Sequence, residues 1–227
     1  MPNMTFTGFD PAAVALLPQL PQLDASDYEG VKDQLASGLR APGAALMEAI
    51  AHRLGPKLTV GRASVSPLHR DLRFAKAGTP RYKDHLLLTT WEGKDRKTSP
   101  MLWLRIDAES VGFASGVMFT PTTRERWRNA VGADSGTTLA KHLAALEKKH
   151  RRHGFDIAGD QLARVPKPWP ADHERADLLR RTGFQVRFME PHPKRIDTPA
   201  FAAWCTQRLG ELWPVHRWLV DHVAEAE

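Results

Sequence analysis

The spacing of apolar positions changes twice along the chain. Between residues 10 and 55 it is helical: Leu46, Ile50 and Leu54 recur at every fourth position and form one apolar stripe. The Gly-Pro pair that follows Leu54 is a stop signal for the last of these helices. The pattern therefore predicts N-terminal helices over 10–55, with a hinge near Pro42.

A strand-like pattern follows over residues 57–119. The runs "DHLLLTTW", "PMLWLRI" and "SVGFASGVMF" are apolar and of strand length, and the links between them are too short for helical crossovers. The glycines of the third run indicate a bend or bulge. The segment "KLTVGRASVSPL", which precedes the first run, is β-like but interrupted. We therefore expect an antiparallel β-meander over 57–119.

Helical patterns return over residues 120–225. We expect a helix from Pro121 to Gly132, one from near Ser135 to the basic run "EKKHRRHG", one from the N-cap Asp172 to Arg181, and a C-terminal helix broken between Gly210 and Pro214. The run "QVRFME" predicts one further strand. Helices, then a meander, then helices predict the α+β class. We expect a single domain over 1–227, with helices packed on the sheet.

Composition sets broad limits. A chain of 227 residues with 42% hydrophobic residues can bury a sizeable core. The net charge of +6 favours acidic partners. The single cysteine, Cys205, excludes an internal disulfide and a four-cysteine zinc site. No signal peptide and no apolar run of about 20 residues is visible, so we expect a cytoplasmic protein without membrane association. The sequence does not indicate the oligomeric state.

Known catalytic motifs do not fit this chain. "HRDL" at 69–72 resembles the catalytic loop of protein kinases, but the metal-binding Asn that such a loop requires is replaced by Lys76. Glycine-rich phosphate loops and a Gly-x-Ser-x-Gly turn are also missing from the sequence. These observations leave open whether the protein is an enzyme, and they assign no catalytic residue.

Histidines give no strong metal motif in the sequence. Of the ten histidines, His150 and His153 are three residues apart within "KKHRRH". The neighbouring cations would oppose a divalent ion, so we interpret this run as a solvated basic helix end that complements the helix dipole. We therefore predict no metal and no cofactor.

The strongest candidate site is a basic cluster in residues 68–91. Its predicted ligand-binding residues are Arg70, Asp71, Arg73, Arg81, Tyr82 and Lys83, joined by Lys167 from a later Pro-rich loop. Arginine presents a planar fork of donors that suits phosphate and carboxylate groups. Asp71 would orient the arginines. The cluster therefore predicts a pocket for a small phosphate- or carboxylate-bearing ligand.

Three other interpretations stay open. The cluster could be a salt-bridged structural corner, or the active site of an enzyme that acts on an anionic substrate. The third interpretation is a nucleic-acid-associated protein that uses the basic helix end 141–153 with Arg124, Arg126 and Arg128. We expect such binding to be weak and non-specific.

Four segments, in order, resemble one known family. They are "RDLRF" with Pro80 and Tyr82-Lys83, "GFASGVMFTPTTRERWRNAV", "LARVPKPWPADHERADLLRRTGF" and "ELWPVHRWLVDHV". This order is similar to the conserved family called domain of unknown function 2461. The resemblance covers most of 10–223 and implies a cytoplasmic α+β single domain and the same arginine cluster, with no settled activity.

The chain departs from the family pattern at several places. The family's Ser-Lys-Asp-Lys is replaced by "AKAG" at 75–78, so one lysine and the acid are missing. Arg81 is inserted between the proline and the tyrosine, and Pro168 replaces the glycine of a Pro-Lys-Gly turn. An Asn-rich stretch expected near 20–28 is replaced by "PQLDASDYEG".

Overall fold

The computed structural model describes residues 5–225. Its strands are β1 (Leu86–Trp91), β2 (Met101–Ile106), β3 (Ser110–Val117), β4 (Asp156–Ala158) and β5 (Phe184–Pro191). Its α-helices are α1 (Pro11–Ala15), α2 (Ala25–Leu35), α3 (Ala41–Leu54), α4 (Pro121–Gly132), α5 (Asp134–His150), α6 (Ala176–Leu179) and α7 (Ala200–His222). Short turns complete the elements: η1 (Leu17–Gln22), the π turn η2 (Ala36–Arg40), η3 (Arg62–Ser64) and η4 (Arg151–His153).

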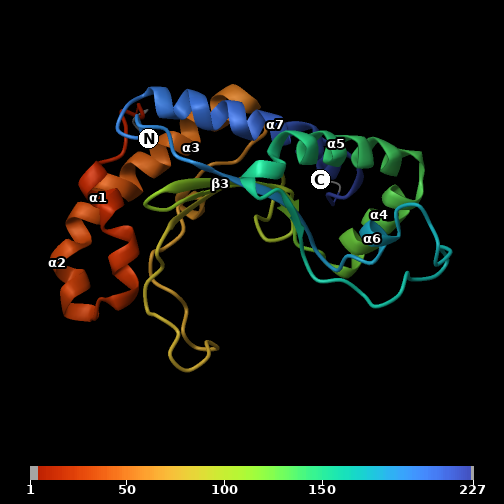
Figure 1. Ribbon diagram of the computed structural model, residues 1–227, viewed down its shortest axis with the longest axis horizontal. Coiled ribbons are helices and arrows are strands. Elements are labelled where there is room, and N and C mark those ends of the chain that lie inside the picture. The colour runs from red at the N-terminus through yellow and green to blue at the C-terminus, as the bar shows by residue number, and fades with distance from the viewer. Residues whose placement is uncertain (1–4, 226–227) are drawn as a thin grey trace.

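The strands form one antiparallel sheet in the order β1-β2-β3-β5-β4. The predicted meander is confirmed as β1, β2 and β3, and the predicted further strand is β5, which pairs with β3 along its whole length. Helices precede and follow the sheet, and α3 and α7 lie along one side of it (Figure 1). The predicted α+β class is therefore correct.

Two details of the predicted sheet are wrong. The segment 57–65 contributes only isolated bridges, Thr59 to Trp91 and Val65 to Leu88, so the strands begin at Leu86. The third run contains no bulge, one of the two features predicted from its glycines, since β3 keeps an unbroken register with both neighbours. The three residues of β4 were not predicted, since so short a strand carries no readable alternation.

The helices also differ from their predicted limits. α7 runs through Pro214 without a break, because its buried side chains hold it against the core on both sides of that residue. The helix predicted from Asp172 is reduced to the four residues of α6. Its expected first turn is replaced by tertiary contacts, in which Arg175 donates to the carbonyl oxygens of Val131 and Ala133. The hinge predicted near Pro42 is the π turn η2, directly before α3.

The core is one contiguous apolar cluster of residues from both ends of the chain, Phe6 to Val223. Trp127 is its largest fully buried side chain, and its indole nitrogen donates to the carbonyl oxygen of Leu178 at 2.9 Å. No helix in the described part of the chain is long and apolar enough to cross a membrane.

Residues 68–83, here called the basic hairpin, extend away from the sheet as a long loop (Figure 1). Backbone hydrogen bonds close its base: the N–H of Arg70 donates to the oxygen of Arg81 at 2.8 Å, and that of Lys83 donates to Leu68 at 2.8 Å. The hairpin enters β1 directly, so it lies at the β1 edge of the sheet.

Candidate functional site

The basic hairpin separates the predicted site residues into a tip and a base. At the tip, Arg73 donates to the Asp71 carboxylate from Nη2 at 2.6 Å and from Nε at 3.0 Å. This hydrogen bonding lowers the pKa of Asp71. Both side chains are exposed, at 79% for Arg73 and 57% for Asp71, so the pair contributes little to stability. The Asp71 carboxylate is therefore paired with Arg73 at the tip of the hairpin.

At the base, Arg70 and Lys83 form a different arrangement. Both are half-buried, and Nζ of Lys83 donates to the carbonyl oxygen of Pro67 at 2.7 Å. Burial, and then the positive charge of Arg70, lower the pKa of Lys83. Nε of Arg70 is buried and has no hydrogen-bond partner in the part of the chain that the structure describes. Within residues 5–225 neither cation makes an ion pair, so their charges repel each other without a compensating carboxylate.

Tyr82 and Arg81 complete the base. The ring of Tyr82 is buried and stacks on Tyr28 of α2, with centroids 4.1 Å apart and an interplanar angle of 6°. This contact holds the hairpin base against α2, a structural role that the sequence did not reveal. Arg81 is exposed.

Lys167 is not brought to this group. It is exposed on the segment that links β4 to α6. β4 and β1 are the opposite edges of the sheet; in Figure 1 the hairpin projects below the sheet, whereas the segment between β4 and α6 lies at the end of the molecule formed by α4 and α6. The sequence offered no means of placing these loops, because their separation depends on the strand order.

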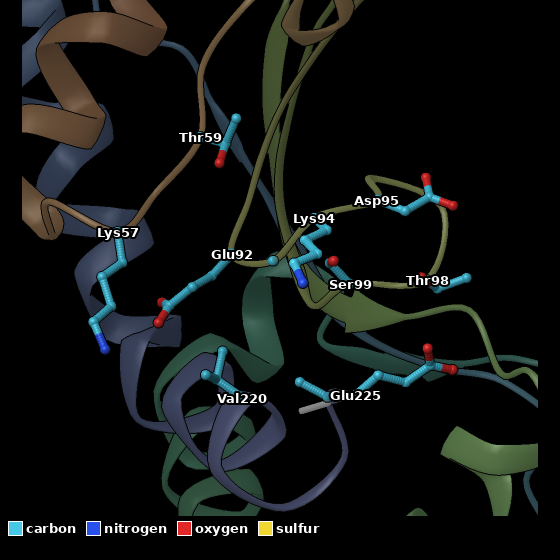
Figure 2. A pocket seen from close by; sticks show the side chains of 11 residues that line it. Lys57, Thr59, Glu92, Lys94, Asp95, Thr98, Ser99, Val220 and Glu225 are labelled. Carbon is cyan, nitrogen blue, oxygen red and sulfur yellow. The ribbon is translucent and has the colours of Figure 1, made fainter. Parts of the chain in front are cut away.

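A cavity of about 600 Å³ lies elsewhere. It is bordered by the loop between β1 and β2, the segment after α3 and the end of α7 (Figure 2). Two lysines, Lys57 and Lys94, face three acids, Glu92, Asp95 and Glu225. These charges do not favour an anion, and the basic hairpin contributes no residue to this cavity.

The basic end of α5 is partly neutralised by acidic side chains. Lys149 pairs with Glu211 at 3.0 Å, and Arg151 pairs with Glu147 at 3.6 Å. On α4, Arg126 donates to the carbonyl oxygen of Ala224. The two ion pairs reduce the charge that this face presents to a polyanion, whereas the contact of Arg126 with a neutral carbonyl group leaves its charge unchanged.

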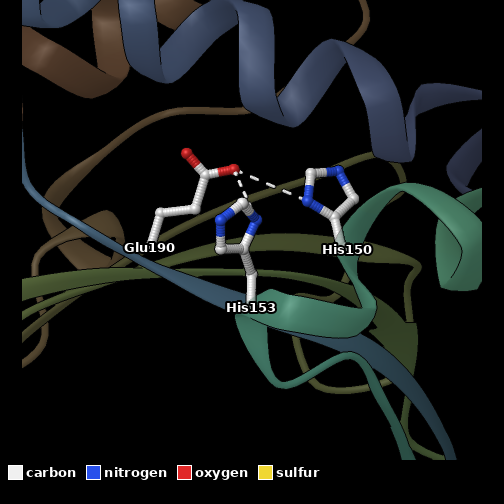
Figure 3. Close-up of side chains that lie close together, drawn as sticks. All are labelled: His150, His153 and Glu190. Atoms are coloured by element: carbon white, nitrogen blue, oxygen red, sulfur yellow. Dashed lines mark ion pairs between the residues drawn. The ribbon is translucent and has the colours of Figure 1, made fainter.

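The expected solvation of His150 is wrong, because only 1% of the residue is exposed. His150, His153 and Glu190 instead lie together beneath α7, with possible ligand atoms within 4.8 Å of one another (Figure 3). The sequence contained one signal for this grouping of side chains. Strand alternation places Glu190 on the same face as Phe184, Val186 and Phe188, where a carboxylate requires a polar or cationic partner.

A five-stranded antiparallel sheet with helices before and after it defines an α+β protein, and the basic hairpin lies at its β1 edge. The model of one family, conserved hypothetical protein (DUF2461), matches residues 25–218. The chain therefore belongs to that family, and the resemblance drawn from the four sequence segments is confirmed. No curated protein and no solved structure matches the chain.

Proposed function

We propose that the base of the basic hairpin binds a small anionic ligand through Arg70 and Lys83. The observation that carries the proposal is the absence, within residues 5–225, of an ion-pair partner for either half-buried cation. Two adjacent positive charges that are partly removed from water destabilise each other. A bound phosphate or carboxylate would relieve this repulsion and satisfy the buried Nε of Arg70.

The other residues of the base have supporting roles in this proposal. Tyr82 holds the hairpin against α2 through its stacking on Tyr28. Arg81 is exposed beside the same base and adds positive charge. Arg73 and Asp71 neutralise each other at the tip and are therefore secondary. Lys167 is too far removed in the fold to share the ligand.

The proposal predicts that phosphate raises the melting temperature of the parent protein relative to sodium chloride of equal ionic strength. Preferential binding to the folded state gives about 2.7 kcal/mol at a ligand concentration of 100 times Kd. Arg70→Gln and Lys83→Met should each remove most of this increase. Differential scanning fluorimetry over a phosphate series measures the effect.

Arg73→Gln is the matched control, because it removes one arginine of the same hairpin that already has a carboxylate partner. It should keep the phosphate response. Equal phosphate responses in the parent and in the folded Arg70→Gln and Lys83→Met variants would reject the site. A parent that phosphate does not stabilise would reject anion binding and leave the cluster as a structural corner.

A further inference from the structure

Three elements bring His150, His153 and Glu190 together. His150 ends α5, and His153 ends the 3₁₀ turn η4 that follows it. Side chains three residues apart nearly eclipse in a 3₁₀ turn, so the two rings lie on one side, with centroids 5.8 Å apart. Gly154, in the left-handed conformation, then turns the chain back toward β4. Glu190 reaches the rings from the buried face of β5.

The contacts of His150 fix which of its nitrogens carries the proton in the neutral ring. Nε2 lies 2.5 Å from Oε2 of Glu211, and an ionised carboxylate can only accept. Nε2 is therefore the protonated nitrogen, and Nδ1 carries a lone pair. Nδ1 is buried, has no hydrogen-bond partner among the described residues, and lies 3.5 Å from Oε1 of Glu190. Two groups that can only accept thus face each other, and a cation between them would stabilise both.

His153 supplies a third possible ligand atom beside Nδ1 of His150 and Oε1 of Glu190. Its Nδ1 lies 3.4 Å from the same Oε1 of Glu190 (Figure 3) and also lacks a hydrogen-bond partner within residues 5–225. Atoms bound to zinc at about 2.0–2.1 Å lie roughly 3.3–3.4 Å apart when the coordination is tetrahedral. The separations of 3.4 and 3.5 Å from Oε1 are therefore close to those of a metal site.

We propose that His150, His153 and Glu190 bind a divalent transition-metal ion, for which zinc is the best-suited ion. Two imidazoles and one carboxylate are borderline ligands of the kind that zinc prefers, and calcium and magnesium prefer oxygen alone. The proposal is independent of the anion site, because it uses none of the residues of the basic hairpin.

The surroundings are those of a supported metal site. Glu211 orients His150 through its other ring nitrogen, the arrangement found for many metal-bound histidines. Arg208 donates to Oε2 of Glu190 at 2.9 Å, which leaves Oε1 for the ion. The ring of His150 stacks on Phe188, with centroids 3.6 Å apart, so it has little freedom to turn away.

Charge and access also fit a bound ion. Arg208 and Lys149 offset the carboxylates of Glu190 and Glu211, so the group is close to neutral before an ion enters. The side chain of His153 is 40% exposed and offers a path from solvent. Three protein ligands with one open side leave room for a water molecule, as in catalytic rather than structural zinc sites.

The test uses the full chain, freed of metal with a chelator and then titrated with Zn²⁺ against a chromophoric competitor. We expect one tightly bound equivalent and a higher melting temperature. Co²⁺ should give the intense visible absorption of a four-coordinate ion. His153→Gln should lose the bound equivalent of Zn²⁺, the rise in melting temperature and the Co²⁺ absorption. Glu211→Gln should weaken Zn²⁺ binding about 10- to 100-fold through its effect on His150.

His142→Gln is the matched control, since it removes a histidine of the same helix outside this group. It should bind Zn²⁺ as the parent does. Glu190→Gln tests the carboxylate separately. This variant, once circular dichroism has shown that it is folded, should also fail to bind the equivalent of Zn²⁺. The proposal is overturned if the metal-free parent takes up no competitor-resistant Zn²⁺, or if folded His153→Gln binds it as tightly as the parent.

Discussion

Glu92 is a buried acid held by two basic neighbours on α7. Nε2 of His216 lies 3.6 Å from its Oε2, and Nη1 of Arg217 donates to both carboxylate oxygens at 2.7 and 2.9 Å. The His216 imidazole, and after it the Arg217 guanidinium, lower the pKa of Glu92 from 4.5 to about 2. The carboxylate therefore links the end of β1 to the C-terminal helix.

Because its pKa is lower in the folded state, Glu92 stabilises the protein above pH 4.5 and loses this effect as the pH falls toward 2. Glu92→Gln should lower the free energy of unfolding at pH 7 by about 3 kcal/mol, because the carboxyl group is much more acidic in the folded protein than in the unfolded chain. The difference from the parent should shrink between pH 4.5 and 2. Urea denaturation at several pH values measures both effects.

Asp221→Asn is the control for this prediction. Asp221 also pairs with Arg217, at 2.6 Å, but its side chain is 55% exposed. An exposed pair contributes at most about 1 kcal/mol. If Glu92→Gln and Asp221→Asn lower the free energy of unfolding at pH 7 by the same amount, burial of Glu92 is not the reason for its contribution to stability.

At the scale of elements, the glycines of β3 have different roles. A Cβ on Gly116 would lie 2.2 Å from the carbonyl oxygen of Phe184 on β5, so the close approach of the two strands requires glycine. A Cβ on Gly112 would have its nearest contact 3.4 Å away, at Cβ of Arg105. Close packing, rather than a bulge, therefore explains the glycine at 116.

Gly116→Ala should destabilise the protein by about 3 kcal/mol, because the added methyl group forces β3 and β5 apart. Gly112→Ala, in the same strand, should change the stability by less than about 1 kcal/mol. Equilibrium unfolding in urea compares the two variants directly. If the two substitutions lowered the free energy of unfolding equally, the separation of β3 and β5 would adjust freely, and their close approach would not require glycine.

At the scale of the whole molecule, the tip of the basic hairpin lies outside the core. From Leu72 to Gly78 every residue is exposed, and Phe74 is 93% exposed. Leu68 and Tyr82, at the base, are the hairpin residues that belong to the apolar cluster. The fold therefore depends on the base and not on the tip.

Replacing residues 72–79 by Asn-Gly should leave the free energy of unfolding within about 1 kcal/mol of the parent, since a shorter loop also costs less entropy to close. Stabilisation by phosphate should persist, because Arg70 and Lys83 remain. Melting curves with and without phosphate measure both properties. A shortened protein that is folded but unresponsive to phosphate would assign the anion site to the tip.

The sequence by itself determined the α+β class, the meander and the family. Each rests on local information: helical spacing of apolar residues gives way to short apolar runs of strand length and then returns, and helix starts carry their own caps, such as Thr120 before α4. It also indicated the segment that holds Arg70, Arg73 and Lys83. It did not predict the continuity of α7 through Pro214 or the shortness of α6, because contacts with distant residues outweigh local preference there.

Only the tertiary structure decided how charged side chains are paired. It joined Asp71 to Arg73, left Arg70 and Lys83 without an ion-pair partner among residues 5–225, and placed Lys167 at the opposite edge of the sheet. It also brought His150 to Glu190, 40 positions later in the chain. The physical reason is that pairing depends on distances of a few ångströms between side chains from separate elements. Strand order and helix packing set those distances, and neither is encoded in the spacing of residues within one segment.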